Sequence, residues 1–141
     1  MYNQDLMLVN QRIKEIRKYR RLEGRELAQR AGLSPSEVSH IERKMRNPKT
    51  DTLQRIAAAL EVSTGYLLGE EDADLPLSRA LARQSLKVFL RHNKVAPQEE
   101  VYVSRICALD SAPETIKGWK DLLANVASPP GQELVFLSKS I

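Results

Sequence analysis

The feature that most constrains this fold is a helix stop followed at once by a helix start. Gly32 comes directly after the helical pattern of Arg25 to Ala31, where a glycine ends helices. Ser34-Pro35-Ser36-Glu37 then offers a capping serine, a proline suited to the first turn and a glutamate that completes a capping box. The sequence therefore predicts two short helices, 25–31 and 35–43, at a steep angle around a tight turn, with the outer face of the second helix free.

The remaining apolar spacing is also helical, and only 7 of 141 residues are aromatic, which favours helix over strand. A first helix runs through Val9, Ile13 and Ile16. A fourth begins at Thr50 or Asp51, and Ser63 caps a fifth. The basic outer face predicted for the first helix consists of Arg12, Lys14, Lys18 and Arg21.

The strongest boundary combines a glycine, an acidic run and a proline, from Gly69 to Pro76. We expect a domain over 1–69, a linker over 70–77 and a second domain over 78–141. Three helices are predicted there: 78–92, one from Pro97, and one opened by a Ser111–Glu114 capping box. The helix from Pro97 carries the apolar residues Val101, Tyr102, Ile106 and Leu109. The sequence predicts an all-α protein.

The net positive charge lies in the first half. Residues 1–69 hold 13 Lys and Arg against 8 Asp and Glu, which gives +5. Residues 70–141 hold 9 against 10, which gives −1, and the two sums recover the total of +4. A basic half joined to a nearly neutral half is consistent with an anionic partner at one end of the molecule, and equally with a random scatter of surface charge.

Several classes of protein are excluded or disfavoured. The single cysteine, Cys107, rules out an internal disulfide framework and a cysteine-based zinc cluster, and His40 and His92 lie far apart. Neither a signal peptide nor an apolar run of membrane-spanning length is visible, so we expect a cytoplasmic protein. The sequence shows no phosphate-binding loop, no Ser/His/Asp arrangement and no specific paired carboxylates, so we do not expect an enzyme. We expect no cofactor and no metal.

Residues 10–68 resemble the helix-turn-helix of Cro/C1-type (XRE) bacterial and phage repressors. The matching stretches are Arg12–Arg17, Glu26–Ser34, Val38–Arg43, Asn47-Pro48 and Leu53–Leu60. This resemblance implies a five-helix domain that binds double-stranded operator DNA as a homodimer and regulates transcription, followed here by a small helical dimerisation domain. The alternative is an antitoxin or protein-interaction regulator that uses the same fold.

Carried over position by position, the resemblance implies that the second helix of the motif is the recognition helix. Its residues facing bases would be Pro35, Ser36, Ser39 and His40, although His40 could contact phosphate instead, and Ser34 would be a further DNA-binding residue. Arg43, Lys44, Arg46 and Lys49 follow as phosphate contacts. Family members usually carry a phosphate-binding glutamine where this chain has Gly24, so either Arg25 replaces that contact or the contact is missing. Arg17 and Glu42 match a partly buried structural ion pair.

The second half contributes an apolar stripe, Ile116, Trp119, Leu123 and Val126, which we interpret as core or as dimer interface. Residues 133–137 form a short apolar stretch in the tail, suited to an added strand or a docking arm. Residues 101–124 resemble, more loosely, repressors of the DNA-damage-response and mobile-element type that a partner metalloprotease inactivates. That resemblance implies cleavage near Ile106 to Ser111, with loss of the dimer.

Overall fold

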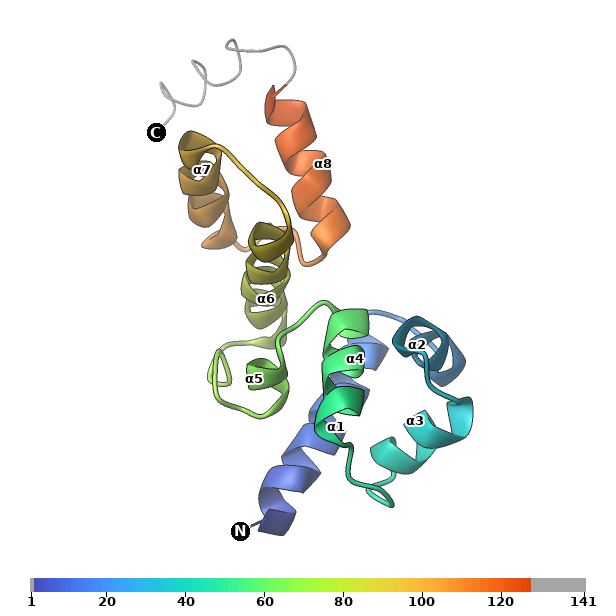
Figure 1. The fold of residues 1–141 in the computed structure, drawn as a ribbon. Helices are drawn as coiled ribbons and strands as arrows, with labels where there is room; N and C mark the ends of the chain where they lie inside the picture. The colour runs from blue at the N-terminus through green and yellow to red at the C-terminus, as the bar shows by residue number, and fades with distance from the viewer. Residues whose placement is uncertain (1, 128–141) are drawn as a thin grey trace. The chain divides into compact units, whose positions relative to one another are not determined.

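The computed structural model describes the backbone of residues 2–127 and the side chains of residues 9–125. Its backbone contacts divide the chain into two compact units, Met1–Ala80 and Leu81–Ile141. Every regular element within the described residues is a helix, which confirms the all-α prediction (Figure 1). The predicted linker, residues 70–77, lies in turns that lead into the first residue of α6. The tail at 133–137 lies outside the described residues.

The first unit contains the five predicted helices: α1 (Tyr2–Tyr19), α2 (Gly24–Ala31), α3 (Pro35–Glu42), α4 (Thr50–Leu60) and α5 (Thr64–Leu67). Their inward faces form one core because the apolar residues recur at helical spacing. Helix α2 packs on α3 and α4, and α1 packs on α3, α4 and α5. The larger core side chains are Val9, Ile13, Ile16, Leu22, Leu27, Val38, Ile41, Leu53, Ile56, Leu60, Val62, Tyr66 and Leu67.

The basic outer face predicted for the first helix is wrong at two of its four positions. Helix α1 ends at Tyr19, and Arg21 lies beyond it with a left-handed backbone, φ 58°. The Arg12 side chain is half-buried: its Nη1 donates to the Tyr66 carbonyl at 2.9 Å, and the guanidinium lies 5.1 Å from the centroid of that ring. Its positive charge is therefore used for packing α1 against α5 by a cation–π contact.

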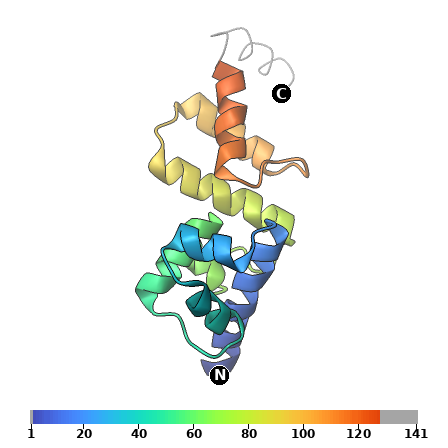
Figure 2. The same ribbon diagram turned by 90° about the vertical axis from the view of Figure 1, so that its right-hand side faces the viewer.

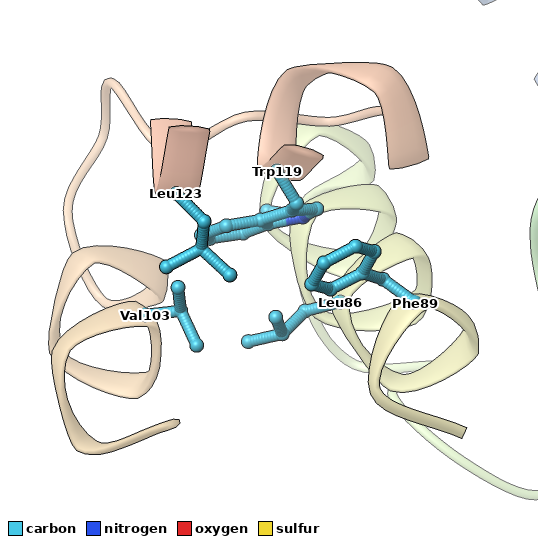
Figure 3. Packing of buried hydrophobic residues seen from close by; sticks show 6 residues of the cluster. Leu86, Phe89, Val103, Trp119 and Leu123 are labelled. Atoms are coloured by element: carbon cyan, nitrogen blue, oxygen red, sulfur yellow. The ribbon is translucent and has the colours of Figure 1, made fainter. Parts of the chain in front are cut away.

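The described part of the second unit begins within α6 (Leu77–His92) and continues with α7 (Pro97–Cys107) and α8 (Ile116–Ala127). Helices α7 and α8 lie side by side (Figure 2). Figure 3 shows the indole of Trp119 among Leu86 and Phe89 of α6, Val103 of α7 and Leu123 of α8. Trp119 is 0% exposed, and its Nε1 donates to Ser85 Oγ of α6 at 3.0 Å. One tryptophan therefore joins all three helices.

This burial corrects the dimer-interface assignment of the α8 stripe. Trp119 and Leu123 belong to the core of their own unit, and Ile116 is partly buried against it. A side chain with no exposed surface cannot contact a second chain unless the core opens. The side chain of Val126 lies outside the described residues.

One local prediction for the second unit is also wrong. The Ser111–Glu114 stretch does not begin a helix: α8 starts at Ile116, and Thr115 Oγ1 caps it by accepting from the Gly118 N–H at 3.0 Å. On α7 the buried valine is Val103, at 0% exposure, whereas Val101 is 54% exposed.

Candidate nucleic-acid interface

The turn between α2 and α3 is fixed by a glycine that adopts a left-handed conformation. Gly32 has φ 69° and ψ 34°, a conformation that glycine adopts without the steric cost of a Cβ. Behind it, the Leu33 N–H donates to the Ala28 carbonyl at 2.8 Å and closes the end of α2. Only Leu33 and Ser34 then separate the turn from α3, so the two helices are held in a tight arrangement (Figure 1).

The start of α3 is fixed by the predicted capping box. Ser34 Oγ accepts from the Glu37 N–H at 3.1 Å, and Glu37 Oε1 accepts from the Ser34 N–H at 3.2 Å. Pro35 occupies the first helical position. These contacts satisfy backbone donors that the first turn would otherwise leave unpaired, so the N-terminal end of α3 is well defined.

Helix α3 divides cleanly into a buried and an open face. Val38 and Ile41 are 2% and 1% exposed and anchor the helix to the core. Pro35 and Ser36 are exposed, and Ser39 and His40 are half-exposed. The outer face therefore presents one apolar surface, two hydroxyls and one imidazole, groups that can contact a thymine methyl or hydrogen-bond to base edges.

Arg17 and Glu42 tie this helix to α1. Arg17 Nε donates to Glu42 Oε2 at 2.7 Å and Nη2 donates to Oε1 at 2.9 Å, a bidentate pair. Arg17 Nη1 also donates to the Leu22 carbonyl at 2.8 Å. The hydrogen bond to Glu42 raises the pKa of Arg17, against the opposing effect of burial. The pair holds the C-terminal end of α3 in place and is not on its open face.

Basic residues lie beyond the end of α3. Arg43, Lys44, Arg46 and Lys49 are all exposed. The chain turns there because Lys44 takes φ 64°, while the Met45 N–H donates to the His40 carbonyl at 2.8 Å. Met45 itself is 69% exposed among these cations. The four charges therefore lie on the segment that links α3 to α4.

A hollow of about 460 Å³ lies beside this segment, and it includes residues that the sequence reasoning missed. Asn47 and Thr52 line it together with Arg46 and Lys49. Lys49 is the N-cap of α4 and gives it no side-chain cap, so the first N–H groups of α4 lie close to these cations. A helix N-terminus beside two cations suits an anion such as a phosphate. The sequence predicts that α4 begins near Thr50, which places Thr52 in its first turn. That position at a helix N-terminus could have identified Thr52 as a candidate residue.

The N-terminal end of α2 is less favourable for phosphate. Glu23 caps α2 and forms a capping box with Glu26, so two carboxylates lie at this helix end. Arg25 Nη2 lies 3.2 Å from Glu23 Oε2, and both side chains are largely exposed. A Cβ added to Gly24 would meet nothing within 4 Å, beside a hollow of about 360 Å³. A phosphate contact by Arg25 would have to compete with its ion pair to Glu23.

Other kinds of site find no support in the part of the chain that the structure describes. No group of three or more His, Cys, Asp or Glu side chains there could hold a metal ion. None of the helices in that part is long and apolar enough to cross a membrane.

Comparison with known proteins gives consistent matches over the first unit. The helix-turn-helix family model matches residues 13–67. The chain is similar to the immunity repressor protein of Bacillus phage phi105, 46% identical over 65 residues, which cover 46% of this chain and 45% of the repressor. It is also similar to the transcriptional regulator SinR of Bacillus licheniformis, 41% identical over 66 residues, which cover 46% and 60% of the two chains. These alignments span about half the length of the two relatives.

A third relative aligns over more residues. The HTH-type transcriptional regulator YobD of Bacillus subtilis, whose function is uncharacterised, is 32% identical over 80 residues, which cover 57% of this chain and 69% of YobD. The family model at residues 13–67 spans α2, Gly32 and α3, in agreement with their geometry. The chain belongs to the Cro/C1-type (XRE) family of helix-turn-helix transcriptional regulators.

Proposed function

We propose that this protein is a transcriptional repressor that binds a palindromic operator as a homodimer through α3. The observation that carries the proposal is the open face of α3, which is anchored by Val38 and Ile41 and followed directly by four exposed cations. A single helix of this kind fits the major groove, with its N-terminal residues at the base edges.

Sequence readout is assigned to the outer face of α3. Ser36, Ser39 and His40 supply hydrogen-bonding groups, and Pro35 supplies an apolar contact. A hydroxyl can serve as donor or acceptor, and an imidazole N–H can donate to guanine acceptors. Ser34 Oγ caps α3 by accepting from the Glu37 N–H, so this side chain mainly positions the helix. Its hydroxyl hydrogen remains as a donor to DNA.

Phosphate binding is assigned to the segment after α3. Arg43, Lys44, Arg46 and Lys49 carry no sequence information themselves, but they place the recognition helix over the groove. Since each neutralised phosphate releases condensed counterions, the affinity should fall steeply with salt, by about 0.9 log units per contact for each tenfold rise in salt.

The shortness of α3 supports a dimer. One short helix contacts only a few base pairs, so two copies related by a twofold axis are needed to read half-sites about 34 Å apart. We assign dimerisation to the second unit, although not to Trp119, because that side chain is buried.

Regulation by a partner metalloprotease is the second part of the proposal, and it rests on the resemblance of residues 101–124. The segment between α7 and α8 includes exposed Leu109, Asp110 and Ser111. A cut near Ile106 to Ser111 would separate α7 from α8, which share the core around Val103 and Trp119. Losing the dimer would remove one of two linked contacts and release the operator.

The test is an operator selection with the full chain, followed by titrations of a labelled operator at several salt concentrations. Arg46→Ala and Lys49→Ala should weaken binding to all sequences and reduce the salt slope by about 0.9 each. Ser39→Ala should change the preferred bases by about 1–3 kcal/mol of discrimination. Lys120→Ala, an exposed charge on α8, is the matched control and should change neither. Absence of any salt-dependent, sequence-preferring binding would overturn the proposal and favour the protein-interaction alternative.

A further inference from the structure

The exposed side of α6 consists of basic residues. From residue 81 to residue 94 every exposed side chain is basic, namely Arg83, Arg91, His92 and Lys94. Lys87 is half-buried and lies one turn after Arg83 and one turn before Arg91. The 16 residues of α6 include no Asp and no Glu. The four cations Arg83, Lys87, Arg91 and Lys94 form a surface that we name the α6 ridge.

Helical spacing places these charges on one face of α6. Arg83, Lys87 and Arg91 are four residues apart, so they lie within about 80° of one another around the helix and span about 12 Å along it. The face that carries Leu86 and Phe89 is buried in the core of the second unit. The packing of α6 therefore leaves its cationic face to solvent or to a partner.

The ridge gives the second unit a positive charge that the sum over residues 70–141 hides. Residues 81–127 hold 7 Lys and Arg against 5 Asp and Glu, which gives +2. Residues 70–80 and 128–141 together hold 2 against 5, which gives −3 and recovers the −1 of residues 70–141. Cations that follow one helix without acidic residues between them are typical of a surface that binds a polyanion.

The surroundings of the ridge favour a nucleic-acid backbone over a protein or a membrane. None of the exposed large apolar side chains in the described residues belongs to α6, whereas a protein interface has an apolar centre. A helix that lies on a membrane inserts an apolar face into the lipid, and the apolar face of α6 is already buried in the core. Over about 12 Å, duplex DNA carries about seven phosphate charges, so each cation of the ridge can find a partner.

We propose that the α6 ridge is a second phosphate-binding surface, which holds the backbone of duplex DNA without reading its sequence. Its guanidinium and ammonium groups bind phosphate oxygens by charge-assisted hydrogen bonds, and such contacts carry no sequence information. The choice of DNA as the polyanion rests on the proposed function. The ridge itself lies in the second unit and requires neither α3 nor an operator.

The experiment is a titration of the full chain with a labelled duplex of random sequence at several salt concentrations. Arg83 and Lys87 also interact with other groups of the chain, so the substitutions are made at Arg91 and Lys94. Arg91→Ala and Lys94→Ala should each lower the salt slope by about 0.9 and weaken binding about fivefold at about 0.15 M salt, and the double variant should show both losses. Lys120→Ala removes the same charge from an exposed position on α8 and is the matched control, with no change expected. Thermal unfolding followed by circular dichroism verifies that each variant is folded.

An unchanged salt slope for the double variant would overturn the proposal. An equal loss for Lys120→Ala would also overturn it, because net charge alone would then explain the binding. If the ridge bound poly-glutamate at least as tightly as the duplex, its partner would be an acidic protein and not DNA.

Operator selection separates this proposal from the proposed function. A chain that prefers no sequence, but loses duplex binding when Arg91 and Lys94 are replaced, contradicts the proposed function and supports the ridge. A chain that selects an operator, while its ridge variants bind the random duplex like the wild type, contradicts the ridge alone.

Discussion

Replacing Glu42 with alanine should destabilise the first unit and affect DNA binding only through that loss. The change removes two charge-assisted hydrogen bonds, of 2.7 and 2.9 Å, and leaves Arg17 with the Leu22 carbonyl as its other described partner. Breaking a buried pair on one side typically costs about 3–5 kcal/mol, because the remaining charge is stranded.

The magnitude for this pair follows from its exposure. The side chains of Arg17 and Glu42 are 15% and 9% exposed, so water reaches part of the stranded guanidinium and lowers the expected cost to about 2–4 kcal/mol. For a unit of this size, each kcal/mol corresponds to about 4–8 °C in the melting temperature. Glu42→Ala should therefore melt lower by about 8–32 °C.

The assay is thermal unfolding of the full chain followed by circular dichroism. Asp121→Ala is the matched control: it also removes a carboxylate from an ion pair, 2.9 Å from Lys117 Nζ, but on the exposed surface of α8, where pairs contribute about 0–1 kcal/mol. Operator affinity of Glu42→Ala should approach the wild-type value at temperatures where the variant is folded. An unchanged melting temperature, or lost affinity in a fully folded variant, would refute the structural role of the pair.

Three further predictions concern other parts of the fold. Gly32→Ala should destabilise the protein by about 1–2 kcal/mol through its backbone alone, since the added Cβ meets nothing nearer than Arg55 Nη1 at 4.0 Å; an unchanged urea midpoint would contradict this. Ser85→Ala leaves the buried Trp119 Nε1–H without its acceptor and should cost about 1–3 kcal/mol, measured by the fluorescence of this single tryptophan in urea. Burial raises the pKa of Tyr66 above its ordinary value near 10, so the unfolded chain ionises first and stability is lost as pH rises through the folded-state pKa. Tyr66→Phe should reduce this alkaline loss, and identical urea midpoints for the two proteins from about pH 8 to about pH 11 would argue against it.

The turn before α3 and the start of α3 could be predicted because the contacts that form them lie within a few residues of sequence. The reciprocal contacts of Ser34 and Glu37 and the left-handed Gly32 need no distant partner. The similar stretch at 111–114 does not begin a helix because Pro113 packs back against the first turn of α8. A Cβ on Gly118 would lie 2.8 Å from the Cβ of Pro113. Thr115 takes the capping role instead, by accepting from the Gly118 N–H.

The errors at Arg12 and Trp119 share one physical origin. Helical spacing shows which residues lie on one face, but not what that face contacts. Arg12 finds its partner 54 residues away, at Tyr66. The stripe around Trp119 could have faced another chain, and three helices of the same unit enclose it instead. The DNA-contact residues remain predictions, since they depend on a partner molecule.

The left-handed backbone at Lys44 sets folding stability against ligand affinity at a single residue. A lysine there costs about 1–2 kcal/mol relative to glycine, because its Cβ crowds the carbonyl, whereas Gly32 ends the preceding helix without that cost. Selection for stability alone would favour glycine at this turn. If the Lys44 charge holds a phosphate, a Lys44→Gly protein should unfold at higher temperature while releasing DNA more readily, so thermostability screens of this protein would tend to select variants that bind DNA more weakly.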